Sequence, residues 1–188
     1  SIPVINALTD QEHPCQILAD FLTIQETFSN FKDLILTFVG DGNNVANSLI
    51  LCSSMLGLQI RVACPKGYEP DPLFVKKARE INKNKNSLII TDDPISAVDG
   101  ANIIYTDVWS SMGEEENKNY KDQKFKGFTI DEKLVSHASN DVIILHCLPA
   151  YRSKEITDEV LEGIHSKVFD QAENRLHVQQ ALLSCILS

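Results

Sequence analysis

Short apolar runs alternate along this chain with longer stretches in which apolar positions recur every three or four residues. The short runs predict five strands, at Leu34–Val39, Leu58–Cys64, Leu88–Thr91, Asn102–Thr106 and Val142–His146. The stretches between them predict helices at about Asn44–Leu56, Pro72–Asn82, Pro94–Val98 and Asp131–Ala138. Such alternation indicates a parallel sheet, because right-handed crossovers place helices on its two faces. We therefore predict an α/β fold: a doubly wound, mainly five-stranded parallel sheet with helices on both faces (Rossmann-like).

Two further helices are expected near the ends of the chain. The segment Thr9–Glu12 has capping-box spacing and predicts a helix that runs to about Ser29. One face of that helix carries the apolar residues Ile17, Leu18, Phe21, Leu22 and Phe28. The last helix is predicted over Gln171–Leu187, with an apolar stripe of Leu176, Leu183 and Leu187. Because Ser1–Val4 reads as the middle of a short strand, we expect this chain to be a piece of a longer protein.

Composition and charge narrow the class of protein. A chain of 188 residues with 43% hydrophobic content can bury the core of one α/β domain, and no linker or repeat divides residues 1–188. The net charge is -9, with 17 Lys+Arg against 26 Asp+Glu, so no basic stripe is available to bind nucleic acid. Five cysteines without a C-x-x-C pair indicate free thiols in a reducing compartment. Neither a membrane span nor a signal peptide is predicted.

The strand that ends in His146-Cys147-Leu148-Pro149 is the strongest indication of chemistry in the chain. Ligands of open α/β sheets bind outside the carboxyl ends of the strands, and Cys147 lies at such an end. Side chains alternate along a strand, so His146 and Cys147 should face opposite ways and should not form a Cys-His dyad. The alternative is that Cys147 is a small buried apolar residue.

A second strand ends in the same manner, because Asn102–Thr106 leads into Asp107 and then Ser111-Met112-Gly113. We expect the two strand ends to share one crevice. A carboxylate beside a hydroxyl and backbone groups favours a ligand that carries an ammonium group. Taken alone, Asp107 is as often the cap of a helix.

The turn after the first predicted strand, Gly40-Asp41-Gly42-Asn43-Asn44-Val45, begins like a dinucleotide-binding fingerprint. Val45 replaces the third glycine, and the second strand ends in Cys64-Pro65 rather than in an acid that could bind a ribose, so the NAD interpretation is weak. A tight turn into a helix N-terminus suits a carboxylate or another small anion. An Asx turn with an asparagine cap is the alternative.

Two segments near the ends of the chain offer donors to a small polar ligand. His13 and Gln16 lie one helical turn apart, so a ring donor and a carboxamide could grip an amide group together. The alternative is a capping histidine with an exposed glutamine. Arg175 is predicted at the start of the last helix, and the chain has four arginines in all, too few to clamp a phosphate fully. A zinc site of His13, Cys15 and Cys147 lacks ligand spacing, so no metal is predicted.

Five ordered segments together resemble the ornithine carbamoyltransferases. They are His13-Pro14-Cys15-Gln16, Gly40-Asp41-Gly42-Asn43-Asn44, Asp107 through Ser111-Met112-Gly113, His146-Cys147-Leu148-Pro149 and Ala172-Glu173-Asn174-Arg175. The resemblance covers essentially the whole chain and is to the second, ornithine-binding domain of that family. The Ser-Met-Gly and His-Cys-Leu-Pro segments distinguish it from the sister aspartate carbamoyltransferases.

The resemblance implies transfer of a carbamoyl group from carbamoyl phosphate to the side-chain amine of L-ornithine, giving L-citrulline and phosphate, without a cofactor. It implies that ornithine binds Asn44, Asp107, Ser111 and Met112, and that carbamoyl phosphate binds His13, Gln16, Arg175 and the backbone of Cys147 and Leu148. Cys147, oriented by Asp107, would help to present an uncharged amine and take up its proton, because only a deprotonated amine can attack. His13 and Arg175 would stabilise the oxyanion.

Two departures from the family pattern are visible. The family's N-terminal carbamoyl-phosphate domain, with its Ser-Thr-Arg-Thr motif, is absent from these residues, and Ser153 stands where a glycine commonly follows the arginine of the cysteine loop. A catalytically inactive, isolated amino-acid-binding domain or fragment is therefore the competing hypothesis, and a dehydrogenase-type nucleotide domain is a third. The resemblance also implies a homotrimer or a multiple of it, a cytoplasmic or organelle-matrix location, and a role in arginine biosynthesis or the urea cycle.

Overall fold

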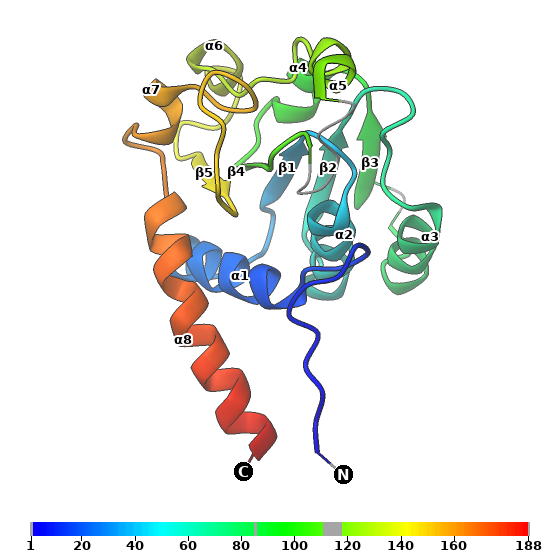
Figure 1. Ribbon diagram of the computed structural model, residues 1–188, viewed down its shortest axis with the longest axis vertical. Coiled ribbons are helices and arrows are strands. Elements are labelled where there is room, and N and C mark those ends of the chain that lie inside the picture. Colours follow the sequence, from blue (N-terminus) through cyan, green and yellow to red (C-terminus); the bar gives the residue numbers. More distant parts are fainter. Residues whose placement is uncertain (1, 85, 111–117, 188) are drawn as a thin grey trace.

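The computed structural model describes residues 2–84, 86–110 and 118–187 and has a five-stranded parallel sheet at its centre (Figure 1). The strands are β1 (Ile35–Val39), β2 (Gln59–Ala63), β3 (Leu88–Thr91), β4 (Ile103–Thr106) and β5 (Ile143–His146). They are arranged in the order β3-β2-β1-β4-β5, and every neighbouring pair is parallel. The predicted α/β sheet is therefore confirmed, with each strand within one or two residues of its expected bounds.

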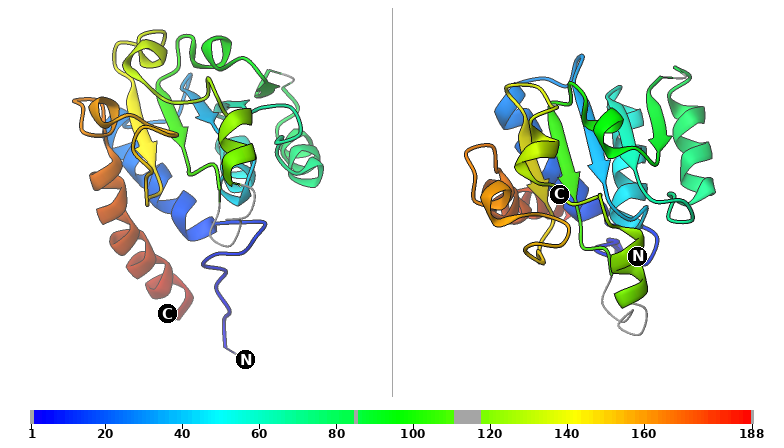
Figure 2. Two further views of the ribbon diagram at one scale, coloured as in Figure 1. Left: turned by 45° about the horizontal axis from the view of Figure 1, so that its top comes forward. Right: turned by 90° about the horizontal axis from the view of Figure 1, so that it is seen from above.

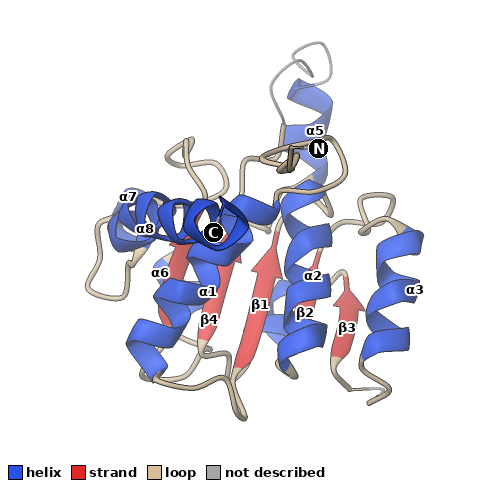
Figure 3. Cartoon of the chain, turned by 90° about the horizontal axis from the view of Figure 1, so that it is seen from below, coloured by secondary structure: helices blue, strands red, loops and turns tan. Residues whose placement is uncertain are grey.

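Eight helices surround the sheet in the described part of the chain. They are α1 (Pro14–Phe28), α2 (Asn44–Leu56), α3 (Pro72–Ile81), α4 (Pro94–Val98), α5 (Lys118–Lys124), α6 (Glu132–Val135), α7 (Asp158–Leu161) and α8 (Val168–Leu187). Helices α1, α2 and α3 cover one face, where α8 crosses α1, and α4, α6 and α7 lie on the other (Figures 2 and 3). The short helices α5 and α7 were not predicted. None of the described helices has the length and apolar character that crossing a membrane requires.

The alternation of side chains along the strands divides the interior into two cores. On β1 and β4, Leu36, Phe38 and Tyr105 face α1 and α2, whereas Val39 and Ile104 face the side of α4 and α6. All five are fully buried. Strands that are buried on both faces are continuous apolar runs, which explains why hydrophobicity alone located them correctly.

The ends of the chain depart from prediction. Residues Thr9–Glu12 form a turn in which the Glu12 N–H donates to Thr9 Oγ1 (3.1 Å), and α1 begins only at Pro14, so the predicted capping box is wrong. The apolar pattern at Ile2 and Val4 does not form a strand, and both side chains are exposed. The predicted position of Leu18 on the buried face of α1 is also wrong, because it is 40% exposed.

Helix α8 begins three residues before its predicted start, so Arg175 lies about two turns inside the helix rather than at its beginning. The N-terminal turns of α8 pack on α1 and bury Gln171 and Asn174. The stripe predicted farther along is exposed, by 58% at Leu176, 46% at Leu183 and 72% at Leu187. In this chain, α8 therefore attaches by polar side chains near its start and presents apolar ones to solvent.

Ser153, the departure from the family's glycine, has a φ of 64°. That is the left-handed region which glycine favours. The Ser153 N–H donates to the Ile156 carbonyl (2.9 Å) and closes the loop. The loop thus keeps a glycine-like backbone at this position despite the serine.

Gly42 lies where the turn after β1 closely approaches the backbone of the loop that contains Tyr68 and Pro70. A Cβ at this position would lie 2.3 Å from Pro70 N and 2.7 Å from the Tyr68 carbonyl oxygen, and the Gly42 N–H donates to that same oxygen (2.9 Å). Position 42 of the turn after β1 therefore has no room for a side chain.

Substitution Gly42→Ala is expected to lower the free energy of unfolding by about 2–4 kcal/mol, because the added methyl group must displace backbone atoms. The matched control is Gly67→Ala, where φ is 88° and nothing lies within 4 Å of an added Cβ, so that only backbone strain of about 1 kcal/mol applies. Urea denaturation of both variants measures the difference. Equal losses would show that the close approach at Gly42 is relieved without cost.

Candidate functional site

The strand order reverses between β1 and β4, and Asn43, Asp107 and Cys147 follow the carboxyl ends of β1, β4 and β5. Asn43 follows β1 and caps α2, because its side-chain oxygen accepts from the N–H groups of Val45 (3.0 Å) and Ala46 (3.2 Å). Its Nδ2 donates to Asp107 Oδ2 (2.7 Å), which follows β4. The Asn43 carboxamide thereby connects the turn after β1 to the residue that follows β4, and these are the two strands between which the order reverses.

Asp107 and Cys147 are brought together by the register of β4 and β5. Thr106 pairs with His146, so the residue after each strand lies beside its counterpart. The Cys147 thiol donates to Asp107 Oδ1 (3.0 Å), and the Val108 N–H donates to the same oxygen (2.7 Å). The two strand ends, which we expected to share one crevice, therefore lie side by side.

Burial raises the pKa of Cys147 well above the ordinary value of a thiol, and the adjacent Asp107 carboxylate raises it further. The thiol therefore keeps its proton at neutral pH in this state of the protein. Its hydrogen bond to Asp107 has the same consequence, because Cys147 acts there as a donor. A protonated thiol cannot act as a base, so Cys147 serves here as a donor to Asp107.

His146 faces the opposite side of the sheet from Cys147, as predicted. Its Nε2 lies 3.3 Å from Glu155 Oε1, and its Nδ1 accepts from the Leu148 N–H (2.9 Å). One ligand-capable atom from each of Asp107, His146 and Cys147 lies within 4.8 Å of the others. Because protein groups already engage both ring nitrogens of His146, we assign no metal to this cluster. The zinc set weighed from the sequence, His13, Cys15 and Cys147, does not form a cluster of potential metal ligands among the described residues.

Gln16 and Arg175, from opposite ends of the chain, meet at the junction of α1 and α8. Arg175 Nη1 donates to Gln16 Oε1 (2.5 Å), while Gln16 Nε2 donates to Asp20 Oδ1 (2.7 Å). Gln16 is buried, contrary to the alternative of an exposed residue. Gln16 Oε1 orients the guanidinium group of Arg175, and Asp20 in turn orients the Nε2 end of the Gln16 carboxamide.

His13 lies one turn before Gln16, and its Nδ1 is 3.0 Å from the Ala7 carbonyl oxygen. In the tautomer that this contact favours, Nδ1 carries the hydrogen and Nε2 is an acceptor. Burial and the positive charge of Arg175 lower the pKa of His13, which disfavours the doubly protonated ring. The predicted donation from His13 to a ligand oxygen therefore requires the other tautomer.

Asp20 was missed in the sequence, although it lies four residues after Gln16 and interrupts an apolar stretch of α1. It is fully buried, and its Oδ1 accepts from Gln16 and from Gln171 Nε2 (2.6 Å) of α8. Burial raises the pKa of Asp20 to about 7, although both carboxamides and Arg175 oppose the shift. A carboxyl group that titrates near neutral pH is therefore built into the junction of α1 and α8.

The other residues that were predicted to bind ornithine or carbamoyl phosphate are Asn44, Leu148, Ser111 and Met112. Asn44 donates through Nδ2 to the Thr9 carbonyl (2.8 Å), and it is the neighbouring Asn43 that contacts Asp107. Leu148, in the loop that follows β5, is 36% exposed. Ser111 and Met112 lie outside the described residues.

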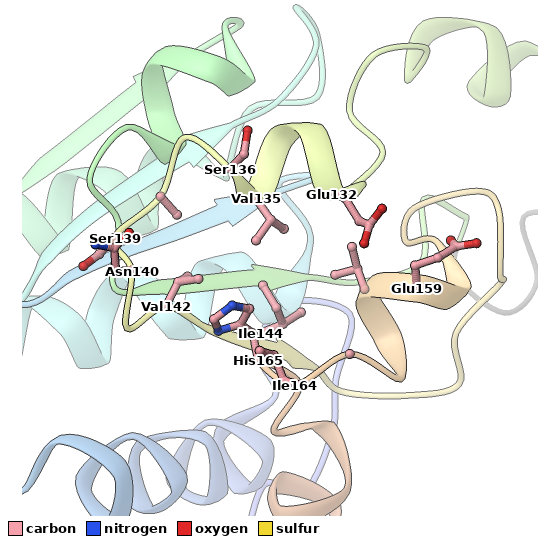
Figure 4. Close-up of a pocket in the computed structure, with 13 residues that line it drawn as sticks. Glu132, Val135, Ser136, Ser139, Asn140, Val142, Ile144, Glu159, Ile164 and His165 are labelled. Carbon is pink, nitrogen blue, oxygen red and sulfur yellow. The ribbon is translucent and has the colours of Figure 1, made fainter.

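A cavity of about 390 Å³ lies away from this cluster, between α6, α7 and β5 (Figure 4). The Glu132 and Glu159 carboxylates stand at one end of it, and Ser139 and Asn140 stand at the other. Its lining includes none of the predicted site residues. We therefore place the candidate site at the reversal of strand order, where Asn43, Asp107 and Cys147 meet.

Comparison with protein families identifies two regions of the chain. Residues 32–186 match the model described as "Aspartate/ornithine carbamoyltransferase, Asp/Orn binding domain". Residues 1–26 match the model of the carbamoyl-P binding domain of the same proteins. His13, Gln16 and Asp20 thus fall in the second match, and Asp107, Cys147 and Arg175 fall in the first.

Curated relatives are longer than this chain. An ornithine carbamoyltransferase of Prochlorococcus marinus subsp. pastoris is 70% identical over 98% of the chain and 60% of its own length. One of Trichormus variabilis is 56% identical over 99% of the chain and 61% of its own length. The chain therefore spans about three fifths of the relatives it matches.

Solved structures share the fold. The ornithine carbamoyltransferase of Gloeobacter violaceus is 47% identical and has a TM-score of 0.90, covering 100% of this chain and 63% of its own. That of Pyrococcus furiosus is 46% identical and has a TM-score of 0.93, covering 98% of this chain and 59% of its own.

Substitution Asp20→Asn is expected to remove a pH dependence of stability. The pKa of Asp20 in the folded protein, about 7, lies above the ordinary aspartate value of 3.8, so Asp20 stabilises the fold at low pH and this stabilisation is lost as pH rises from about 4 to about 7. Across that window the unfolding free energy of the parent should fall relative to the variant by about 2–4 kcal/mol. Urea titrations at several pH values measure it, with Glu26→Gln on the same helix as control. Parallel profiles for parent and Asp20→Asn would contradict the assignment.

Proposed function

This chain belongs to the aspartate/ornithine carbamoyltransferase family, and we propose that it is the ornithine-binding part of an ornithine carbamoyltransferase. The reaction is transfer of the carbamoyl group of carbamoyl phosphate to the side-chain amine of L-ornithine, which yields L-citrulline and phosphate. The observation that carries the proposal is the contact of Cys147 with Asp107, at 3.0 Å, where the strand order reverses. A carboxylate and a thiol side by side suit a substrate with two amino groups.

In this proposal, Asp107 binds the α-ammonium group of ornithine. Asp107 is 8% exposed, and Asn43 and the Val108 N–H hold both of its carboxylate oxygens in place. A fixed and nearly buried carboxylate binds an ammonium group more strongly than an exposed one, because solvent screens it less. Asn44, Ser111 and Met112 remain predicted ligands of the amino-acid end.

The carbamoyl group would lie toward His13, Gln16 and Arg175. Gln16 holds the guanidinium at 2.5 Å, so a donor to the developing oxyanion is already oriented before the substrate arrives. The backbone of Cys147 and Leu148 is proposed to contact the same group. His13 and Gln16 are supplied by the start of α1, and Arg175 is supplied by α8.

Bond formation requires an uncharged amine. The side-chain nitrogen of ornithine forms a bond to the carbamoyl carbon, the bond from that carbon to the phosphate oxygen breaks, and the nitrogen gives up its proton. An ornithine ammonium paired with Asp107 would offset the negative charge that raises the pKa of Cys147. Substrate binding would thereby convert the thiol into a better proton acceptor than it is in the free protein.

The partners follow from the family. We propose that the missing carbamoyl-phosphate domain precedes this chain and supplies the phosphate-binding groups, since the match to that domain covers residues 1–26 alone. A homotrimer or a multiple of it, a cytoplasmic or organelle-matrix location, and a role in arginine biosynthesis or the urea cycle belong to the same proposal. The alternative is an isolated domain that binds ornithine without turnover.

A chimera tests the activity. The part of the Prochlorococcus marinus relative that precedes its match to this chain is joined to these 188 residues, and citrulline formation is measured with ornithine and, in parallel, carbamoylaspartate formation with aspartate. The chimera should make citrulline, whereas the chain alone should bind ornithine but make none, because it lacks most of the phosphate-binding cations. A chimera that folds but carbamoylates aspartate, or neither amino acid, would refute the proposal.

Substitution Asp107→Asn in this chimera should lower kcat/KM for ornithine by at least about thirtyfold, because it removes the charge that pairs with the ammonium group. The KM for carbamoyl phosphate should change little. Steady-state kinetics with both substrates varied measure this, and Asp141→Asn, an exposed acid before β5, is the matched control. An unchanged kcat/KM for ornithine would remove Asp107 from the binding site.

A further inference from the structure

Lys121 of α5 forms an ion pair with Asp41 in the turn after β1, and this pair is nearly closed to solvent. Lys121 Nζ lies 2.6 Å from Asp41 Oδ2, and the two side chains are 9% and 17% exposed. An exposed ion pair contributes little, because water screens both charges. A sheltered pair differs, because removing one partner leaves a charge that water does not compensate. This contact therefore holds α5 against the turn after β1.

Aromatic side chains pack near Lys121. Its Nζ lies 5.6 Å from the ring centroid of Tyr68, and the rings of Tyr68 and Phe125 meet edge to face with centroids 4.9 Å apart. Phe125 directly follows α5 and stacks on Trp109, with centroids 5.4 Å apart. Trp109 is 7% exposed, and Phe125 is fully buried. The surroundings of Trp109 therefore depend on where α5 lies.

The turn that contains Asp41 also supports the candidate site. Asn43 Nδ2 donates to Asp107 Oδ2 (2.7 Å), and the Asn43 N–H donates to the Asp41 carbonyl oxygen (2.7 Å). Between them, the Gly42 N–H donates to the Tyr68 carbonyl oxygen (2.9 Å). The Asp41 side chain thus fixes the same short turn from which Asn43 reaches Asp107.

Two alternate residues of this turn contact the chain on both sides of one stretch of sequence. Asn43 contacts Asp107, which directly follows β4, and Asp41 contacts Lys121 in α5. These two contacts therefore set where the chain leaves β4 and where α5 lies.

We propose that Lys121 is a positioning residue of the ornithine site, which acts through the turn after β1 on the Asp107 carboxylate. The identity of the substrate rests on the proposed function. Asp107 binds an ammonium group well only while its oxygens are held in place, and Asn43 holds Oδ2 from the turn that Lys121 fixes. No proton or chemical group is transferred at Lys121. Loss of the ion pair should therefore weaken ornithine binding, although Lys121 is not one of the predicted ligands.

The fluorescence of Trp109 tests the anchoring without any substrate, because Trp109 is the single tryptophan of the 188 residues. In Lys121→Met, α5 should lose its anchor, and the acrylamide quenching constant of Trp109 should rise at least about twofold. Lys121→Arg keeps a cation that can pair with Asp41, so its quenching should remain near that of the parent. Lys124→Met is the matched control, because Lys124 is an exposed lysine of the same helix, and its quenching should equal that of the parent.

The double variant Asp41→Asn/Lys121→Met separates positioning from stability. Each single substitution leaves one sheltered charge without this partner, so the urea midpoint should fall in both single variants. The double variant removes both charges, so its midpoint should recover toward that of the parent. Its Trp109 quenching should nevertheless stay raised, because the ion pair is still missing. The double variant also decides the matter if a single variant does not fold.

Kinetics of the chimera test the consequence for ornithine. Lys121→Met should raise the KM for ornithine about tenfold and lower kcat by less than about threefold, because the substitution weakens binding rather than the chemical step. The KM for carbamoyl phosphate should not change, and Lys121→Arg should restore the KM for ornithine. A merely structural lysine would lower the yield of folded enzyme and leave the KM of the remainder unchanged.

Parent-like quenching of Trp109 in folded Lys121→Met or in the double variant would overturn the proposal. An unchanged KM for ornithine in an active Lys121→Met chimera would overturn it as well. A parent chimera that folds but makes no citrulline would refute the proposed function instead. The quenching measurements need no substrate and would still decide whether Lys121 anchors the turn, so the two proposals can fail separately.

Discussion

The residues that directly follow two paired parallel strands must lie side by side, and this constraint determines the candidate site. The register that pairs Thr106 with His146 places Asp107 next to Cys147, and the reversal of strand order between β1 and β4 lets Asn43 reach the same carboxylate. No loop has to be positioned independently to make these contacts. The positions of Asp107 and Cys147 are therefore set by the register of the sheet, whose strands are buried on both faces.

A second constraint comes from the buried polar junction of α1 and α8. Asp20 accepts from Gln16 and Gln171, and Gln171 Oε1 accepts from the His146 N–H at the end of β5 (2.9 Å). A buried polar group must find partners, so the two helices can dock in few other ways. The same junction orients Arg175 and joins the region matched by the carbamoyl-P domain model to the region matched by the Asp/Orn domain model.

Much of this could be predicted from the sequence, and the failures have physical causes. The strands follow from their continuous apolar runs, and the opposed directions of His146 and Cys147 follow from the period of two along a strand. The meeting of Asp107 with Cys147 follows from the alignment of neighbouring parallel strands, whose carboxyl ends lie at one edge of the sheet. The start of α1 could not be predicted, because Thr9 and Glu12 make a local turn that satisfies the same donors as a capping box. Asp20 and Asn43 were missed because their importance depends on partners far away in the chain, at Gln171 and Asp107.

The docking of α8 on α1 also sets an order of events during synthesis. All five strands precede α8 in the chain, and proteins begin to fold from the N-terminus as they are made. The sheet can consequently form while Asp20 is still open to water and ionised like an ordinary carboxyl group. When α8 arrives, it covers Asp20, supplies Gln171 and delivers Arg175 in one step. A chain that had formed its sheet but not yet docked α8 would therefore lack both the cover over Asp20 and the guanidinium group of Arg175.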